Sequence, residues 1–257
     1  MRIVSWNIRA GGGQRFAEIY HQLQQWQPDI VALSEFRATP PSRRLAKLLA
    51  ENGLPHQLTT TDPDRPATNA LLLASRLPLT QVYHPAAPAE PTRWLLAQIA
   101  TTPPLALGVM HVPNYVSGRK YPFHEAVLAV VEAWQLGPGL LIGDTNSGLP
   151  GLDEETKVFG PKEKGWFESL AARGWVDIFR ELNGEARVYT WYSPNGGNGF
   201  RLDQTFVNQP LRPHVLQANY VWGKSASAPE RRDALSDHAA MIVEVALKIS
   251  IVQGNHC

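Results

Sequence analysis

The sequence has little cysteine, no long hydrophobic run and almost no net charge. Its single cysteine is the last of 257 residues, Cys257, which excludes an internal disulfide framework and a cysteine-based zinc cluster. No segment approaches the roughly 18 apolar residues of a membrane span, and the apolar stretch at the start is too short for a secretory signal. A net charge of +1 excludes the long-range field of a strongly basic nucleic-acid binder but allows local basic strips. We therefore expect a cytoplasmic protein without membrane association.

The composition is that of a folded chain, with 44% hydrophobic and 18% charged residues. No repeat, low-complexity tract or linker divides the sequence, because its glycines and prolines are spread through predicted turns. We expect a single domain over residues 1–250 and a C-terminal tail at 251–257.

Hydrophobic periodicity predicts more strands than helices. A helix is expected where apolar residues recur from Phe16 to Trp26, and Ser42 is expected to cap a second helix that stops at Asn52-Gly53. Strands are predicted at 3–6, 29–34, 70–74, 94–100, 105–111, 140–143, 202–207, 215–222 and 239–246, and further helices at 123–134 and 166–173. Strands and helices do not alternate strictly. The pattern favours an α/β fold, a four-layer α/β/β/α sandwich of two mixed β-sheets flanked by helices.

Polar residues that suit catalysis follow or precede several predicted strands. They are Asn7, Glu35, Asp144, Asn146, Asp203, Asp237 and His238. One such residue alone is equally typical of a turn. Several carboxylates at one cleft repel each other unless a cation neutralises them, and Mg²⁺ takes oxygen ligands of this kind. The histidines are scattered and no HExxH motif is present, so zinc is not expected.

Six ordered segments resemble the endonuclease/exonuclease/phosphatase superfamily. They are WNI at 6–8, Glu35 after PDIVALS, HVPN at 111–114, GDTN at 143–146, RLD at 201–203 and SDH at 236–238. The resemblance spans nearly the whole chain and implies a two-sheet sandwich with metal-dependent cleavage of a phosphoester. Within the superfamily, the aromatic stretch 189–192 and the segment 200–203 resemble the exonuclease III and apurinic/apyrimidinic endonuclease branch.

The resemblance also implies roles for individual residues. It assigns catalysis to Asp144, His238, Asn146, Asp203 and His111, metal binding to Glu35, Asn7 and Asp237, and substrate binding to Asn7, Asn114, Trp191, Phe200, Arg201 and Leu202. In the branch, Asp144 would deprotonate the attacking water, and His238, steadied by Asp203, would bind a phosphate oxygen or shuttle a proton. Trp191, Phe200 and Leu202 would line a pocket for an extruded abasic sugar.

Three features depart from that pattern or lie outside it. His111 stands where the branch usually has tyrosine and is more similar to deoxyribonuclease I and some phosphatases. Ser34 replaces a glutamine that commonly precedes the metal-binding glutamate. Arg119 and Lys120 are expected either to contact DNA phosphates or to form a solvated charged face.

Three functions follow from these observations. The first is a Mg²⁺-dependent DNA phosphodiesterase, in which Mn²⁺ can substitute, that acts as an abasic-site endonuclease with 3′–5′ exonuclease or 3′-end processing activity in DNA repair. Its partner would be double-stranded DNA with abasic sites or 3′ ends, and the enzyme would be a monomer. The second is a phosphatase or phosphodiesterase acting on a small-molecule or lipid phosphoester, which His111 favours. The third is a non-catalytic scaffold that binds DNA or protein.

Overall fold

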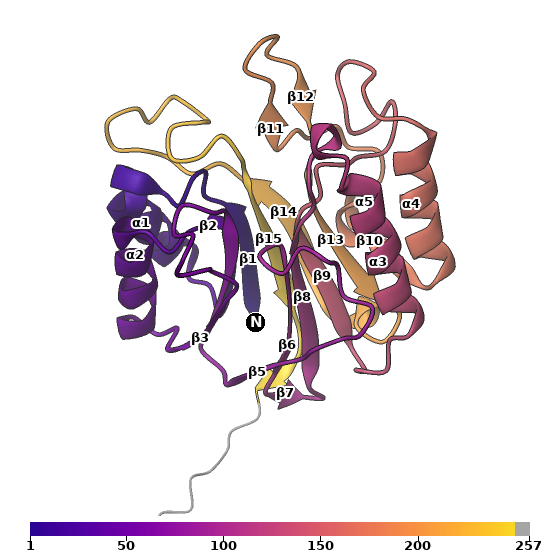
Figure 1. Cartoon of the computed structure of the whole chain (residues 1–257), viewed down its shortest axis with the longest axis horizontal. Helices are drawn as coiled ribbons and strands as arrows, with labels where there is room; N and C mark the ends of the chain where they lie inside the picture. The colour runs from indigo at the N-terminus through magenta and orange to yellow at the C-terminus, as the bar shows by residue number, and fades with distance from the viewer. Residues whose placement is uncertain (250–257) are drawn as a thin grey trace, which may run out of the picture.

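The computed structural model describes residues 1–249, so the tail predicted at 251–257 lies outside the described residues. Two six-stranded sheets pack face to face between helices (Figure 1). The first sheet has the order β14 (Val215–Val221), β15 (Ala240–Val245), β1 (Arg2–Asn7), β2 (Ile30–Phe36), β4 (Ala70–Ser75) and β3 (His56–Thr59). The second has the order β10 (Trp175–Asp177), β13 (Asp203–Asn208), β9 (Gly139–Asp144), β8 (Leu105–His111), β6 (Trp94–Ile99) and β5 (Leu79–Gln81).

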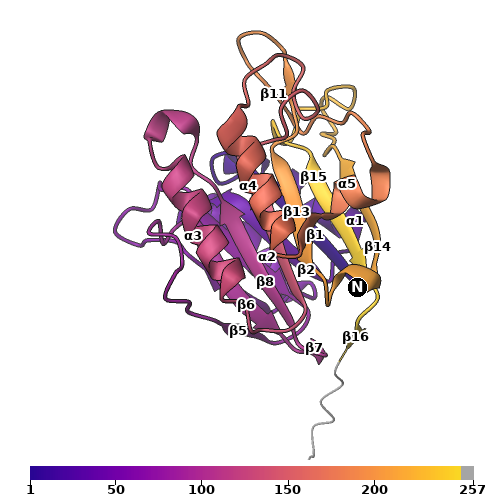
Figure 2. The same ribbon diagram turned by 90° about the vertical axis from the view of Figure 1, so that its right-hand side faces the viewer.

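Both sheets are mixed, since β1 and β2 pair in parallel, as do β8 and β9, while their other neighbours are antiparallel. Helices α1 (Phe16–Trp26) and α2 (Pro40–Glu51) cover the first sheet. Helices α3 (Lys120–Glu132) and α4 (Pro161–Ala172) cover the second, as Figure 2 shows. The four-layer sandwich predicted from the sequence is therefore confirmed.

The remaining elements are short. They are helix α5 (Ile178–Asn183), the hairpin of β11 (Trp191–Tyr192) and β12 (Gly199–Phe200), the pair β7 (Thr101–Thr102) and β16 (Lys248–Ile249), and the 3₁₀ turns η1 (Gly13–Arg15), η2 (Tyr115–Ser117) and η3 (Arg212–His214). The hairpin stands above the ends of the main strands in Figure 1. Within residues 1–249, no helix combines the length and the apolar character needed to cross a membrane.

The core has three apolar layers because successive strand residues point to opposite faces of a sheet. Leu140 and Ile142 of β9 pack between the two sheets, whereas Leu141 packs with α3 and α4. Trp6 of β1 faces the other way, toward α1 and α2. Burial on both faces explains why the central strands read as continuous hydrophobic runs in the sequence.

Three predicted helix starts were wrong: α3 begins at Lys120 and not at residue 123, α4 begins at Pro161 and not at residue 166, and α2 is capped one turn earlier than expected. Ser42 is not an N-cap, because α2 begins at Pro40 and its N-cap residue is Thr39. The Ser42 hydroxyl instead donates a hydrogen bond of 2.8 Å to the carbonyl of Gly11. Gly11 has φ of +73°, and a Cβ at this position would lie 2.6 Å from Ser42 Oγ. The contact therefore fixes the loop that follows β1.

Candidate active site

The predicted catalytic residues meet at one edge of the sandwich because of strand register. Asn7 of β1 pairs with Ser34 of β2, one residue before Glu35. In the second sheet, Asp144 at the end of β9 pairs with His111 on one side and with Asp203 on the other. The two sheets face each other at β1 and β9, so these strand ends share a single edge.

Glu35 reaches this edge through a bulge in β2. The register shifts between Ser34 and Phe36, and Glu35 has a φ of +56°. A non-glycine residue in this left-handed region costs about 1–3 kcal/mol and is held only where its surroundings require it. Here the backbone N–H of Ala10 donates to Glu35 Oε2 at 2.8 Å, and Asn7 Nδ2 lies 3.5 Å from Oε1.

Asp144 is the buried centre of the site. Its Oδ2 accepts a hydrogen bond from Asn7 Nδ2 at 3.0 Å, and its Oδ1 accepts one from the backbone N–H of Asn146 at 2.9 Å. The Nε2 atoms of His111 and His238 lie 3.6 Å and 3.9 Å from Oδ2. Burial raises the pKa of the Asp144 carboxyl, and the histidines oppose this increase.

The backbone before Asp144 requires glycine. A Cβ on Gly143 would lie 1.9 Å from the carbonyl oxygen of Met110, and φ at this residue is +143°. The first letter of GDTN therefore serves the close pairing of β8 and β9, which places His111 opposite Asp144.

His238 and Asp203 form a buried pair. His238 Nδ1 lies 2.9 Å from Asp203 Oδ2, and the indole N–H of Trp6 donates to the His238 carbonyl at 2.9 Å. Burial alone would lower the pKa of His238, but Asp203 and Asp144 outweigh it and raise the pKa to about 10. His238 is therefore an imidazolium at neutral pH.

His111, unlike His238, is neutral at neutral pH. Burial lowers its pKa to about 4, more than the neighbouring Asp144 raises it. His111 Nδ1 is buried and has no hydrogen-bond partner among the described residues. The Asp144 carboxylate thus has the neutral imidazole of His111 on one side and the charged imidazole of His238 on the other.

The cationic partner of the carboxylates at this site is the imidazolium of His238, and not a lysine or an arginine of the described chain. Glu35, Asp144 and Asp203 form no ion pair with a lysine or arginine of residues 1–249. Ligand atoms of Asp144, Asp203 and His238 all lie within 4.8 Å of one another, the spacing of a metal-binding group. The predicted ligands Glu35 and Asn7 lie outside this group, and Asn7 turns its Nδ2 toward Glu35 and Asp144, so their metal-binding roles stay predictions. The carboxylate oxygens of this edge are donors that suit a hard divalent cation.

An aromatic cluster adjoins His238. Trp191 pairs with His238 through an isolated backbone bridge, and their ring centroids lie 6.4 Å apart. Phe200 and Leu202 join Trp191 in one apolar cluster, and both are more than nine-tenths buried, so their lining of a sugar pocket stays a prediction. Phe159, which the sequence did not single out, completes the cluster with its ring edge-on to Phe200 at 5.8 Å. Trp191 is the one predicted pocket residue that remains half-exposed.

Two predicted substrate contacts are wrong, because the residues are buried in ion pairs. Arg201 is fully buried and its guanidinium binds the carboxylates of Asp153 and Asp177. Lys120 is buried inside α3, where its Nζ lies 2.8 Å from Glu163 Oε1. Neither side chain is available to a DNA phosphate.

The other predicted residues are placed as follows. Asn114 is exposed, and its side chain caps η2 by accepting from the N–H of Ser117 at 3.3 Å. Arg119 is exposed next to it. Asn146 donates through Nδ2 to the Val112 carbonyl at 2.8 Å. Asp237 is half-buried and acts on His238 through its charge, but it lies outside the group of three ligands, so its metal-binding role stays a prediction.

The sequence interpretation missed Arg93. Its Nη1 donates to the carbonyl of His111 at 3.3 Å, and its charge interacts with Asp144 and Glu35. Arg93 precedes the first residue of β6, which runs antiparallel to β8. The start of an antiparallel strand lies at the same sheet edge as the end of its neighbour. The arginine directly before a predicted strand was therefore a usable signal.

Comparisons with known proteins agree with this geometry. A model of the Endonuclease/Exonuclease/phosphatase family matches residues 4–238. An exodeoxyribonuclease of Streptococcus pneumoniae is 22% identical over 284 residues, which cover 96% of this chain and 100% of the relative.

Solved structures show the same fold. An AP endonuclease from Archaeoglobus fulgidus is 17% identical, with a TM-score of 0.78 and coverage of 96% of this chain and 99% of the other. A 3′ phosphatase, NExo, from Neisseria bound to a product DNA hairpin is 21% identical, with a TM-score of 0.74 and coverage of 95% and 99%. The match covers the strand ends that carry Asn7, Glu35, Asp144 and His238, and the chain therefore belongs to the Endonuclease/Exonuclease/phosphatase family, as an enzyme that cleaves phosphoesters.

Proposed function

We propose that the protein is a Mg²⁺-dependent DNA phosphodiesterase that acts at abasic sites and at 3′ ends. The observation that carries this proposal is the buried group of Asp144, Asp203 and the His238 imidazolium, to which Asn7 links Glu35. Phosphoryl transfer needs a positioned water, neutralised phosphate oxygens and a stabilised leaving oxygen. This group supplies residues for each requirement.

The residues divide the work according to their charge. Asp144 accepts the proton of the attacking water, and its raised pKa makes it a stronger base than an ordinary aspartate. Glu35 and Asn7 would hold the cation, which neutralises phosphate oxygens when bound. His238, kept protonated by Asp203, donates a hydrogen bond to a phosphate oxygen as negative charge develops. Asn146 has a second amide hydrogen that can reach the same phosphate.

DNA as the substrate is supported by the aromatic cluster and by the names of similar proteins. A half-exposed Trp191 beside His238 suits stacking on a nucleotide or packing against a sugar. Relatives and structural neighbours are described as an exodeoxyribonuclease, an AP endonuclease and a 3′ phosphatase bound to DNA. Phe200, Leu202 and Phe159 pack against Trp191 in one apolar cluster, a surface that suits a sugar without a base.

The test uses labelled DNA duplexes that carry either one internal abasic site or one 3′-phosphate, incubated with Mg²⁺ or with EDTA. We expect cleavage of both with Mg²⁺ and of neither with EDTA. Asp144→Asn should abolish cleavage, whereas Glu168→Gln, the same change at an exposed residue of α4, should keep the full rate. Failure to process either duplex with Mg²⁺ would contradict the proposal.

A second candidate substrate is a small or lipid-borne phosphoester, and the neutral His111 beside Asp144 is the observation that favours it. A panel that compares the abasic duplex with inositol phosphates and phosphocholine esters separates the two. We expect the DNA to be cleaved with the higher kcat/KM.

A further inference from the structure

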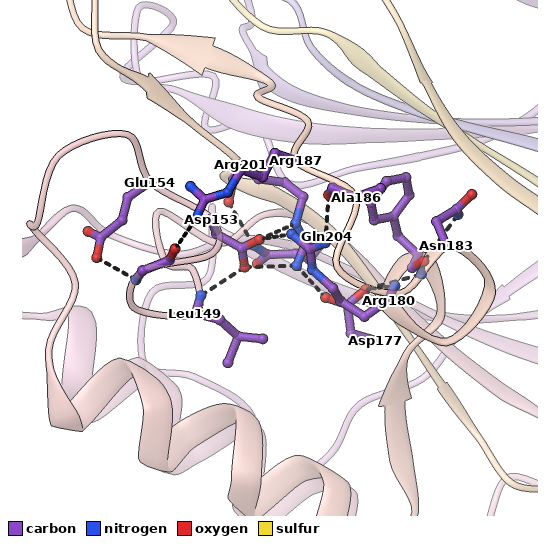
Figure 3. A network of polar contacts seen from close by, with 12 residues as sticks. Leu149, Asp153, Glu154, Asp177, Arg180, Asn183, Ala186, Arg187, Arg201 and Gln204 are labelled. Carbon is purple, nitrogen blue, oxygen red and sulfur yellow. Dashed lines mark hydrogen bonds and ion pairs between the residues drawn. The ribbon is translucent and has the colours of Figure 1, made fainter.

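A buried network of charged side chains lies directly behind the site. Arg201 donates from Nε and Nη2 to the two oxygens of Asp153 at 2.8 and 2.9 Å, and from Nη2 to Asp177 Oδ2 at 2.5 Å. Arg180 also contacts Asp153. Figure 3 shows the two arginines and the two aspartates gathered at one place. Because two positive and two negative charges meet, the network is neutral.

The network joins segments that flank the catalytic residues. Asp153 lies in the loop after β9, which ends with Asp144, and Arg201 lies two residues before Asp203. Asp177 caps α5 by accepting from the N–H groups of Phe179 and Arg180. The network thus ties three segments of the chain together near the site.

Tyr220 connects this network to Asp203. Arg201 Nη1 donates to the Tyr220 hydroxyl at 3.2 Å, and that hydroxyl donates to the backbone carbonyl of Asp203 at 2.5 Å. Desolvation raises the pKa of Tyr220 well above its ordinary value, so the hydroxyl keeps the proton that it donates. The N–H of Asp203 is held as well, by Thr190 Oγ1 at 3.3 Å. Both backbone groups of Asp203 are therefore fixed by side chains.

The contact also crosses between the sheets. Tyr220 belongs to β14 of the first sheet, whereas Asp203 begins β13 of the second. The Asp203 carboxylate then reaches back to His238, which precedes β15 of the first sheet. Asp203 is thus held against the first sheet both through its carbonyl and through its side chain.

We propose that Tyr220 is a positioning residue for catalysis, which transmits the fixed geometry of the Arg201 network to the Asp203–His238 pair. In this role Tyr220 does not contact the substrate and acts only through Asp203. A displacement of about 1 Å at a catalytic pair can cost up to about 100-fold in rate, and supporting hydrogen bonds prevent such displacements. The inference rests on the catalytic role proposed above for Asp203 and His238.

The test is Tyr220→Phe, which keeps the ring and its packing 4.8 Å from Phe179 but removes the hydroxyl. We expect kcat to fall by about 10-fold and KM to stay within about 2-fold, on an abasic duplex and on bis(4-nitrophenyl) phosphate, a diester that needs no DNA recognition. The matched control is Tyr20→Phe in α1, where the tyrosine packs in the core on the outer face of the first sheet. This control should keep the wild-type kcat.

A double-mutant cycle separates positioning from general stabilisation. Once Asp203→Ala has removed the carboxylate, there is no pair to position, so Tyr220→Phe should change the single-turnover rate by less than about 2-fold. A full additional loss in that background, or an unchanged kcat in the single variant, would overturn the inference while leaving the proposed function intact. If Asp203→Ala itself kept the wild-type rate, the proposed function and this inference would both fail.

Discussion

Two buried charged clusters lie side by side in this protein, and they differ in how their charge is balanced. Around Arg201, two arginines meet two aspartates and every carboxylate contacts a guanidinium. Around Asp144, the ion-pair partners of Asp144 and Asp203 are histidines, of which only His238 is charged, and Glu35 has no ion pair within residues 1–249. Buried charges without partners are costly and persist where function requires them. We therefore assign the balanced cluster to the stability of the fold, and we propose that the unbalanced cluster binds a cation and carries out catalysis.

The largest difference should appear when one carboxylate of the unbalanced cluster is removed. Asp144→Asn should lower the rate of phosphodiester cleavage by about 10³-fold or more, because the base is lost. Its free energy of unfolding should stay equal or rise, since a buried and poorly balanced charge disappears. Single-turnover kinetics and urea denaturation measure the two quantities. A strong loss of stability would mean that Asp144 belongs with the structural cluster.

In the balanced cluster, removal of one charge should instead lower the stability of the fold. Arg201→Met should lower the free energy of unfolding by about 3–5 kcal/mol, because Asp177 loses its guanidinium partner and Asp153 loses one of its two. Lys164→Met, which breaks the exposed pair with Glu168, is the control and should cost less than about 1 kcal/mol. Urea denaturation measures the free energy of unfolding of both variants. Similar losses in the two would mean that the Arg201 network contributes no more than an exposed ion pair.

Cation binding at the unbalanced cluster should stabilise the folded protein. Saturating Mg²⁺ should raise the free energy of unfolding by about 1–3 kcal/mol, as expected for a ligand that binds the folded state alone. Glu35→Gln should remove most of this gain while the Arg201 network stays unchanged. Thermal unfolding with and without Mg²⁺ measures the effect, and an equal gain in Glu35→Gln would exclude Glu35 as a ligand.

Without metal, the site should also make stability depend on pH. The pKa of His238 is raised to about 10 in the folded protein, above the ordinary value of 6.5. Its contribution to stability is therefore complete below pH 6.5 and is lost as the pH rises through about 10. In EDTA, Tm should fall between pH 7 and 10, and Asp203→Asn should flatten this decrease. A wild-type Tm that stays constant over this range would argue against the charged pair.

The smallest expected effect concerns two neighbouring basic residues. Arg119 is exposed, so Arg119→Ala should weaken DNA binding by a few-fold at low salt and reduce its salt dependence. Lys120 is buried against Glu163, so Lys120→Met should leave the affinity unchanged and lower the stability instead. Fluorescence anisotropy at several salt concentrations tests both expectations. A loss of affinity in Lys120→Met alone would reverse the assignment.

The fold and most of the polar site were predictable from sequence because both depend on strand patterns. Asn7, Glu35 and Asp144 follow apolar strands, and strand ends share an edge once the sheets form. Local sequence patterns were less informative about which side chains form ion pairs. Arg201 looked like a substrate contact because its acidic partner, Asp153, lies 48 residues away in the chain.

Other errors have the same physical origin. Lys120 pairs with Glu163 across two helices, which no local pattern reveals. Phe159 reaches the aromatic cluster from a loop, where hydrophobic periodicity gives no signal. Long-range pairing of side chains, rather than the identity of the strands, was the information that the sequence did not provide.

The most direct test of the unbalanced cluster is anomalous diffraction from crystals soaked in Mn²⁺, which occupies Mg²⁺ sites. We predict one strong peak within about 2.0–2.3 Å of carboxylate oxygens that include Glu35, at the edge that carries Asp144 and His238. A peak elsewhere on the molecule, with none at this edge, would contradict the claim that the carboxylates of the unbalanced cluster bind a metal ion.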